Sequence, residues 1–495
     1  MAKKDVKIVR NYINGKWVAV KGVETLDVHN PSTGEVIAKT PLSTISMTNE
    51  AIEAAAKAFP KWSATPVSKR ADYIFHLAQL LRENEDRICR VLVEEMGKSL
   101  PDAHAEMKRA IENCEVACGI PMLQQGDKLI GISDGIDGEV IRVPVGVFTA
   151  IMPFNFPAMV PFWFLPFAIA TGNTFILKPS ERVPLTMELI TEYIDKTGLP
   201  AGVFNLVNGN KTVSNAFMES PHVKGISIVG STRVCKIVAE KCAQTGKRCQ
   251  AMGSAKNHLV VMPDAKLDEV VRNMVTSCYG CAGQRCMASS AIVCVGDDTY
   301  KEVCDKFIAA SKGVVVADPL DPKYADEKVL MGPVISLEAK ERILGLIEDG
   351  IKEGATIALD GRNLIIKGRE KGYYIGPTVF TDVKPGMKIH KTEIFGPVVV
   401  ILKCENFEEA IKIVNSLEYG NGASIYTQSG YYARRFKLEA EAGMIGINIG
   451  IPAPAAYMPF GGMKDSLFAD IKAQGKSIVR FYTDEKIVTE RFWEE

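Results

Sequence analysis

The chain has 495 residues, of which 47% are hydrophobic and 24% are charged. Lys plus Arg and Asp plus Glu each number 59, so the formal net charge is zero. A length well beyond the ~250–300 residues of a single core predicts at least two domains, and the even charge balance argues against a nucleic-acid partner.

The first 17 residues contain neither an apolar signal core nor an Arg/Ser-rich transit pattern. The most apolar run, residues 156–172, is shorter than the ~20 residues of a membrane span and is broken by three prolines. We expect no membrane association and expect this run to be buried beside a site. Twelve cysteines without a secretion signal predict free thiols in a reducing, cytoplasmic compartment.

A helical pattern covers residues 48–118. A first helix is expected over 48–59, with Thr48 as its N-cap, and an uninterrupted helical period over 72–98 is expected to stop at Gly97.

Apolar runs then alternate with helical patterns. Strands are predicted over 145–152, 174–178, 203–207, 225–230 and 258–262, and helices over 184–198, 213–220 and 231–244. This alternation is typical of a parallel sheet made of βαβ units, here a Rossmann-like α/β cofactor domain, which would bind ligands at the carboxyl ends of its strands.

A second alternating region begins after residue 262 and predicts another α/β domain. Helices are expected over 265–277, 298–311, 337–353, 407–417 and 430–441, and strands over 291–295, 356–360, 398–403, 423–427 and 444–448. Two strand-like segments, 126–145 and 477–492, fit neither domain. Exposed strands often pair between subunits, so we predict a homo-oligomer, a dimer or a tetramer.

Three cysteines, Cys278, Cys281 and Cys286, lie within residues 277–289, "SCYGCAGQRCMAS". They could be disulfide partners, metal ligands, core thiols or a nucleophile. The C-x2-C-x4-C spacing lacks the fourth ligand that zinc or iron–sulfur sites usually need, and the six histidines show no metal spacing, so no metal site is expected.

Two neighbours distinguish Cys286 from the other two cysteines. Gly283 allows close backbone approach, and Arg285 places a cation beside the thiol, where it would favour the thiolate. These features favour Cys286 as the nucleophile and leave Cys278 and Cys281 as packing residues, although a buried core thiol remains the commoner role of a cysteine.

Asn155 stands among prolines and aromatic residues between a predicted strand and a helix. An unpaired buried amide is unfavourable, so Asn155 must have a partner. It could stabilise a substrate oxyanion, for which one donor contributes roughly 3 kcal/mol, or it could fix the loop.

With these residues the chain resembles the aldehyde dehydrogenase superfamily over nearly its whole length. The matching stretches are NPSTGEVI (30–37), PVGV (144–147), PFNFP (153–157), ILKPSE (176–181), GLPAGVFNLV (198–207), VGST (229–232), GQRCMA (283–288), EIFGPV (393–398) and PFGGMKDS (459–466). The stretches AKNH (255–258), CMA (286–288) and 446–468 are most similar to its methylmalonate-semialdehyde (malonate-semialdehyde) dehydrogenase subfamily.

The resemblance implies an aldehyde dehydrogenase fold. Residues 1–125, 147–253 and 446–466 would form the NAD-binding domain, 254–445 the catalytic domain, and 126–146 with 467–495 the oligomerisation strands. Cys286 would form a thiohemiacetal and then a thioester, and the Asn155 side chain with the Cys286 N–H would hold the oxyanion. The implied cofactor contacts are Phe154, Lys178, Glu181, Gly230, Ser231, Glu393 and Phe395. Glu181 would repel a 2′-phosphate, which favours NAD over NADP.

One departure from the superfamily pattern concerns the acyl acceptor. Most members carry Glu-Leu-Gly-Gly-Lys, whose Glu is the general base for deacylation, whereas this chain has MGSAK with Met252 in its place. Without a base, water (pKa near ~15.7) is a poorer nucleophile than a thiol (pKa ~8.5), so coenzyme A is the expected co-substrate.

The subfamily resemblance further implies loss of carbon dioxide to give propionyl-CoA or acetyl-CoA, and a clamp on the substrate carboxylate formed by Arg109 and Arg285. Two alternatives stay open: a hydrolytic NAD(P)-dependent enzyme for another acidic aldehyde such as succinate semialdehyde, and a non-catalytic protein on a dehydrogenase scaffold.

Overall fold

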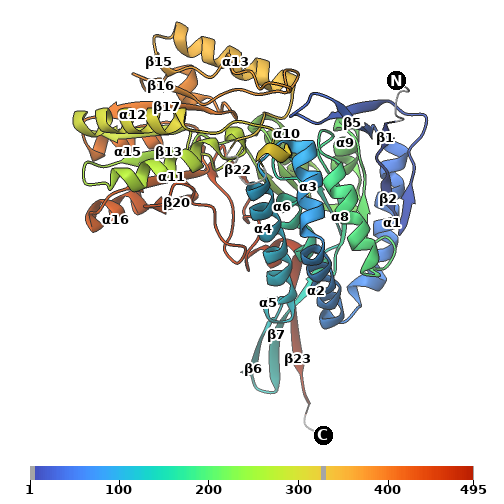
Figure 1. The fold of residues 1–495 in the computed structure, drawn as a ribbon. Helices are drawn as coiled ribbons and strands as arrows, with labels where there is room; N and C mark the ends of the chain where they lie inside the picture. Colours follow the sequence, from blue (N-terminus) through green and yellow to red (C-terminus); the bar gives the residue numbers. More distant parts are fainter. Residues whose placement is uncertain (1–5, 325–330, 494–495) are drawn as a thin grey trace.

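Two large β-sheets, each covered by helices, lie side by side, and a three-stranded arm projects away from them (Figure 1). The structure is a computed structural model that describes residues 6–324 and 331–493. It confirms the expected α/β class.

The first sheet has the strand order β22-β12-β11-β8-β9-β10-β2-β3. Its strands are β22 (Leu467–Phe468), β12 (Arg248–Met252), β11 (Val223–Val229), β8 (Val147–Ile151), β9 (Thr174–Lys178), β10 (Phe204–Leu206), β2 (Asn11–Ile13) and β3 (Lys16–Val18). The central strands from β12 to β10 are parallel, and the edge strands are antiparallel. Near-continuous burial of β8 and β9 reflects the helices on both faces.

The helices on the two faces of this sheet form separate cores. One face is covered by α1 (Ile45–Ser63), α9 (Lys211–Glu219) and α10 (Thr232–Gln244). The other is covered by α2 (Val67–Glu83), α3 (Glu85–Met96), α4 (Leu100–Cys118), α6 (Met159–Phe162), α7 (Leu165–Ala170) and α8 (Leu185–Lys196).

Two expectations about the N-terminal helices were wrong. The side chain of Thr44, not Thr48, caps α1 by accepting a hydrogen bond from the Met47 N–H. The helical period over 72–98 breaks at Asn84, whose φ of −121° is not helical, so that α2 and α3 are separate helices. The stop at Gly97 is confirmed, because Gly97 adopts the left-handed φ of 84° that suits a glycine.

The second sheet has the order β15-β16-β17-β14-β13-β19-β20. Its strands are β15 (Thr356–Leu359), β16 (Thr378–Thr381), β17 (Val398–Cys404), β14 (Ala291–Val295), β13 (His258–Val261), β19 (Gly422–Tyr426) and β20 (Met444–Ile447). Only β15 pairs antiparallel among these described strands. The run at 258–262, expected to continue the first series, instead lies at the centre of this sheet, and β12 and β16 were not predicted.

The helices that pack on the second sheet match the expected ones to within a few residues. They are α11 (Leu267–Tyr279), α12 (Asp297–Lys312), α13 (Leu337–Lys352), α15 (Phe407–Asn415) and α16 (Gly430–Glu439). Smaller elements are β1 (Lys7–Ile8), β4 (Thr25–His29), β5 (Val36–Pro41), α5 (Ile120–Leu123), η1 (Gly280–Gly283), η2 (Pro322–Tyr324), α14 (Lys388–Lys391), β18 (Tyr419–Gly420), β21 (Met463–Lys464) and α17 (Ile478–Tyr482).

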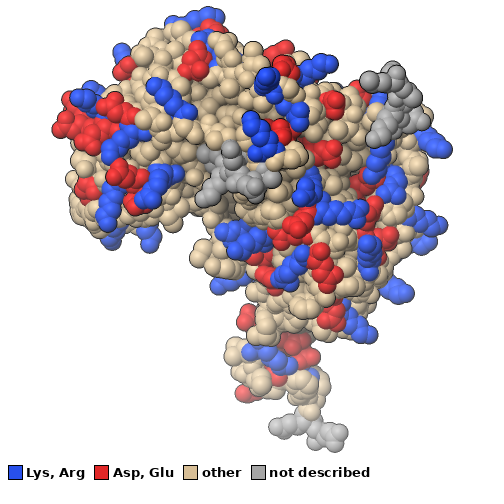
Figure 2. All heavy atoms as spheres, in the orientation of Figure 1, with Lys and Arg blue, Asp and Glu red and all other residues tan. Residues whose placement is uncertain are grey.

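The arm consists of β6 (Asp127–Ser133), β7 (Ile136–Pro144) and β23 (Thr483–Arg491), in the order β23-β7-β6. Every residue of β6 is exposed, including Leu129 and Ile130. On the face shown in Figure 2, basic and acidic side chains are interspersed over the whole molecule. None of the helices within residues 6–324 and 331–493 has the length and apolar character that crossing a membrane requires.

Candidate active site

The candidate site lies where the carboxyl ends of the first sheet meet the amino ends of the second. Asn155 follows β8, and Cys286 precedes β14. The Asn155 side-chain amide donates to the Gln284 carbonyl at 2.9 Å, so the two loops are in direct contact across this boundary. The structure therefore brings together the two residues that the sequence marked as candidates for catalysis.

Cys286 is carried by a tight left-handed turn that follows α11. Cys281, Ala282 and Gly283 have φ values of 53°, 54° and 71°. A Cβ atom on Gly283 would lie 2.1 Å from the Gly396 carbonyl oxygen, so only glycine permits this approach between the Cys286 loop and the loop before β17. The close approach expected of Gly283 is confirmed and has a specific partner.

Two asparagine side chains fix the backbone of Cys286. The Asn257 and Asn421 amides donate to the Cys286 carbonyl at 2.8 and 2.9 Å. Asn257 is itself held, because its side-chain oxygen accepts from the Gly422 N–H at 3.0 Å. Since Asn257 and Asn421 immediately precede β13 and β19, the second sheet sets the position of Cys286.

The Cys286 thiol is partly buried and packs against the apolar core of the first sheet, which includes Met252. Burial, together with the negative charge of Glu393, raises the pKa of Cys286 to about 12. The backbone N–H groups of Cys286 and Met287 act in the opposite direction. The thiol is therefore protonated at neutral pH, with N–H donors beside it that favour an anion.

The other two cysteines of the cluster are buried. The Cys278 thiol donates to the Ser289 carbonyl at 2.9 Å and lies in the core, as expected of a packing residue. Cys281 is buried with its sulfur 3.4 Å from Arg285 Nε and 3.6 Å from Asp102 Oδ2. All twelve cysteines are free thiols, as predicted.

A buried ion pair holds the loop that carries Asn155. Lys98 Nζ lies 2.5 Å from Glu106 and donates to the Asn155 carbonyl at 2.7 Å, and both side chains are fully buried. The other Glu106 oxygen accepts from the Ala158 and Met159 N–H groups at 2.8 and 3.0 Å. Both charges are thus compensated by each other and by the backbone, which allows their burial.

One face of α4 carries Asp102, Glu106 and Arg109, which are spaced by four and three residues. Asp102 lies 2.5 Å from Arg285 Nη2 and accepts from the Cys281 N–H at 3.1 Å. Glu106 holds the Asn155 loop, so this face of α4 is turned toward the site. Arg109 continues the same face.

The two expected arginines differ in exposure, and each already has a carboxylate partner. The Arg285 side chain is mostly buried and is paired with Asp102, whereas Arg109 is 42% exposed and is paired with Glu112 at 2.6 Å. Within residues 6–324 and 331–493, no hydrogen bond involves Arg285 Nη1. That group remains available to a further acceptor.

The residues expected to bind the cofactor lie along the carboxyl edge of the first sheet. Lys178 ends β9, and its buried Nζ lies 3.2 Å from the partly exposed Glu181 carboxylate. Burial raises the pKa of the Glu181 carboxyl, but the charge of Lys178, hydrogen bonds from Lys178 and the Glu181 backbone, and the charge of Arg182 together outweigh it, and the net shift is downward. Gly230 follows β11, and a Cβ there would meet nothing within 4 Å, so the space beside it is open. Ser231 is the N-cap of α10 and makes no capping side-chain bond.

Two other expected cofactor residues, Glu393 and Phe395, precede β17 of the second sheet, whereas Phe154 follows β8 of the first. The Phe154 and Phe395 rings pack edge to face with centroids 5.7 Å apart. Glu393 is partly buried near the segment that joins β12 to β13. Burial raises the pKa of Glu393 to about 7, although Ser254 and the Ala255 backbone act to lower it.

Met252 is the last residue of β12 and is 3% exposed. Its carbonyl accepts from the Gly230 N–H at 3.0 Å and from the Cys235 thiol at 3.2 Å. Its side chain belongs to the apolar cluster that Cys286 packs against. An apolar thioether, not a carboxylate, therefore occupies this end of β12.

His258 is the first residue of β13 in the second sheet. Its Nε2 lies 2.9 Å from Nε2 of His390, and both rings are buried. Burial lowers the pKa of His258 well below its usual range and that of His390 to about 4, so both are neutral at pH 7. This pair joins β13 to α14.

The sequence did not predict the residues that hold the Asn155 and Cys286 loops in place: Lys98, Asp102, Glu106, Asn257, Gln284 and Asn421. One signal was present, because Asp102, Glu106 and Arg109 recur at helical spacing in a helix that must bury one face. Lys98 and the asparagines had no such signal, since their partners are distant in sequence.

The chain was compared with known proteins. The pattern of the aldehyde dehydrogenase family matches residues 17–488. Malonate-semialdehyde dehydrogenase 1 of Geobacillus kaustophilus is 43% identical over 99% of each chain. Among solved structures, one described as a methylmalonate-semialdehyde dehydrogenase of Sinorhizobium meliloti, complexed with NAD, has a TM-score of 0.97 and 41% identity and covers 100% of this chain and 99% of its own. The methylmalonate-semialdehyde dehydrogenase of Oceanimonas doudoroffii has a TM-score of 0.96 and 40% identity, with 99% of each chain covered. The chain therefore belongs to the aldehyde dehydrogenase family.

Proposed function

We propose that this enzyme oxidises malonate or methylmalonate semialdehyde with NAD, through a thioester on Cys286, and passes the acyl group to coenzyme A with loss of carbon dioxide. Full-length relatives with these names support the substrate class. The apolar residue at the end of β12 is the observation that carries the choice of acceptor.

In the first half of the reaction, the Cys286 sulfur attacks the aldehyde carbon, and the carbonyl oxygen becomes an oxyanion. The Asn155 amide and the Cys286 N–H would donate to this oxygen, and such donors favour the transition state over the ground state. The thiol must lose its proton first. Because Glu393 raises the Cys286 pKa, the thiolate gains stability when that carboxylate is neutralised.

NAD supplies the hydride acceptor when it is bound, and several features of the chain fit it. The open space beside Gly230 at the start of α10 suits the pyrophosphate, because free N–H groups at a helix start favour anions. Lys178 and Glu181 would contact the adenosine ribose, and Glu393, Phe154 and Phe395 would surround the nicotinamide half. The solved relative complexed with NAD supports this cofactor.

In the second half, the acceptor attacks the Cys286 thioester. A water molecule would need a general base, and Met252 has no group that accepts a proton. A thiol has a pKa about seven units below that of water and already offers some thiolate near neutral pH. The site should therefore favour the coenzyme A thiol and release Cys286 as the leaving group.

A carboxylate placed β to the thioester carbonyl can leave as carbon dioxide, with its electron pair passing to the α-carbon, which then takes up a proton. Malonate semialdehyde would give acetyl-CoA, and methylmalonate semialdehyde would give propionyl-CoA. Arg109, on the α4 face that meets the site, and the free Nη1 of Arg285 would hold the carboxylate before it leaves.

The test is to measure products from malonate semialdehyde and NAD with and without coenzyme A, in wild type, Met252→Glu and the matched control Met252→Leu. We expect acetyl-CoA as the product of wild type and Met252→Leu, with slow turnover when coenzyme A is absent. Met252→Glu should gain coenzyme A-independent release of free acid. Equal rates with and without coenzyme A in wild type, with free acid as product, would contradict the proposal.

We further propose that the arm mediates homo-oligomerisation. Leu129, Ile130 and Ile132 of β6 and Ile487 of β23 expose apolar surface on strands that project from the molecule. Replacing Ile130 and Ile487 by lysine should lower the mass measured by light scattering, and an unchanged mass would exclude this role.

A further inference from the structure

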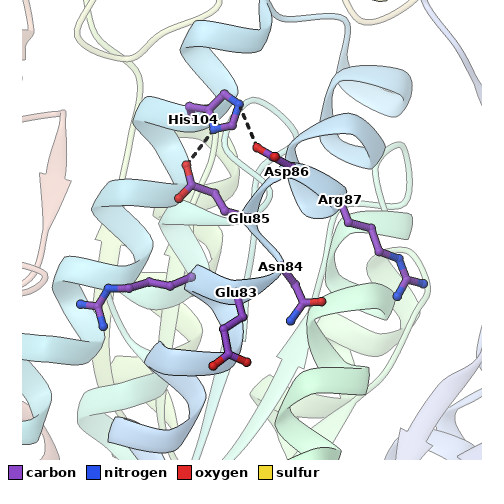
Figure 3. A pocket seen from close by; sticks show the side chains of 7 residues that line it. Glu83, Asn84, Glu85, Asp86, Arg87 and His104 are labelled. Atoms are coloured by element: carbon purple, nitrogen blue, oxygen red, sulfur yellow. Dashed lines mark hydrogen bonds and ion pairs between the residues drawn. The ribbon is translucent and has the colours of Figure 1, made fainter.

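A cluster of potential metal ligands lies outside the catalytic site, between α3 and α4. His104 Nδ1 is 2.7 Å from Glu85 Oε1 and 3.6 Å from the Cys89 sulfur. The ligand atoms of these three residues all lie within 4.8 Å of one another. His104 Nε2 is 3.7 Å from Asp86 Oδ1, on the other side of the ring (Figure 3).

Helix geometry brings these side chains together. Glu85 and Cys89 are four residues apart on α3 and therefore share one face of that helix. His104 comes from α4, two residues before Glu106. Among the residues that the structure describes, this is the one group of three His, Cys, Asp or Glu residues close enough to hold an ion.

The spacing suits a tetrahedral metal. With bonds of ~2.3 Å to sulfur and ~2.1 Å to nitrogen, a tetrahedral zinc ion separates those two ligand atoms by about 3.6 Å. The observed separation between Cys89 and His104 Nδ1 is 3.6 Å. The Glu85 oxygen would need to move away from the ring by roughly 0.7 Å to reach the same geometry, and its side chain is 31% exposed and free to do so.

The surroundings leave the acidic groups available and the site open to solvent. A cavity of about 370 Å³ lies against the 82–87 turn and His104. The two arginines of this turn have partners elsewhere: Arg82 pairs with Glu115, and Arg87 is near Glu192 and donates to the Tyr193 hydroxyl. Figure 3 shows Arg87 directed away from His104. A water molecule could complete the coordination from the cavity.

We propose that Glu85, Cys89 and His104 form a binding site for zinc or a similar divalent transition-metal ion. The ion replaces the thiol proton of Cys89, which is released to solvent, and the imidazole proton of His104 lies on Nε2, facing Asp86. The bound ion joins α3 to α4. Because α4 also carries Asp102 and Glu106, the ion stiffens the helix that supports the Cys286 and Asn155 loops.

The experiment uses Co²⁺ as the probe on the full-length enzyme in a Cys286→Ser background, so that the nucleophile cannot contribute. We expect a thiolate-to-cobalt charge-transfer absorption, titrating to about one ion per chain and displaced by Zn²⁺. The absorption should be lost in Cys89→Ser and kept in the control Cys118→Ser, which alters a partly exposed thiol at the C-terminal end of α4.

Two further variants keep the test decisive if Cys89→Ser folds poorly, because the side chains of His104 and Asp86 are exposed. His104→Gln should abolish the absorption, and Asp86→Asn should weaken cobalt binding about 10-fold, the lower end of the usual effect of a residue that orients a ligand. Zn²⁺ should raise the melting temperature of the Cys286→Ser protein but not that of His104→Gln. Absence of the absorption at millimolar Co²⁺, or its persistence in folded His104→Gln, would overturn the proposal.

Discussion

The loops that carry Asn155 and Cys286 face each other, but they are held in place in different ways. The Asn155 loop depends on ions, because the buried Lys98–Glu106 pair bonds to its carbonyl and to two of its N–H groups. The Cys286 loop depends on neutral contacts: two asparagine amides donate to the Cys286 carbonyl, and Gly283 packs closely against the Gly396 carbonyl. The ionic support is sensitive to loss of one charge, whereas the neutral support is sensitive to added volume.

Removing one charge from the ionic support should have the largest effect. Lys98→Met leaves the buried Glu106 carboxylate without its counter-ion, and we expect a loss of about 3–5 kcal/mol in the free energy of unfolding, measured by urea denaturation. The control is Lys98→Met with Glu106→Gln, which removes both charges and keeps an oxygen for the Ala158 and Met159 N–H groups. The double variant should recover part of the loss, and equal instability of the two proteins would contradict the role of the ion pair.

Adding a methyl group to the neutral support should have a smaller effect on stability and a clear effect on activity. Gly283→Ala carries a left-handed strain of about 1–2 kcal/mol and must also displace the Gly396 carbonyl. Gly246→Ala is a matched control, because Gly246 has a similar φ of 65° and nothing within 4 Å of an added Cβ. We expect kcat to fall only in Gly283→Ala. Equal behaviour of the two variants would show that the contact between the loops is unimportant.

The smallest expected effect concerns the influence of the Glu393 charge on the reactivity of the Cys286 thiol. Glu393 raises the Cys286 pKa only when it is ionised, and its own pKa is about 7. Glu393→Gln should therefore increase alkylation of Cys286 above pH 7 by less than about tenfold, which corresponds to less than one pKa unit. The increase should vanish well below pH 7, where the wild-type carboxyl is protonated as well.

This measurement follows the Cys286 peptide by mass spectrometry in the absence of cofactor, because eleven other thiols are present. Glu405→Gln on the surface is the control. An alkylation ratio between Glu393→Gln and wild type that does not depend on pH would exclude the charge of Glu393 as the cause.

Features that depend on the local sequence pattern were predicted. Features that depend on contacts between residues distant in sequence were not. The parallel α/β character, most helices and the arm strands followed from periodicity, and Gly97 and Gly283 followed from backbone conformation. The strand β12 was missed because its polar residue Gln250 is buried and bonded to Ser227 and to the 471–472 backbone. A sequence pattern cannot show such pairing.

The same contrast holds for the site. The chemistry of Cys286 and Asn155 and of their sequence neighbours was enough to predict them as candidate site residues. The structure brings their loops into contact. Lys98, Asn257 and Asn421 carry no local signal, because the backbone carbonyls of Asn155 and Cys286 to which they donate are distant in sequence. The pairing of Arg285 with Asp102 likewise follows from the packing of α4 against the Cys286 loop.

The most direct test of acyl transfer without a general base is a rapid-mixing experiment with malonate semialdehyde and NAD. Without coenzyme A, the absorbance of NADH should rise in a burst of about one equivalent per chain and then slow down, because the acyl-enzyme accumulates. Coenzyme A should raise the slow phase and leave the burst unchanged. A linear time course without a burst, at a rate that coenzyme A does not change, would contradict the account.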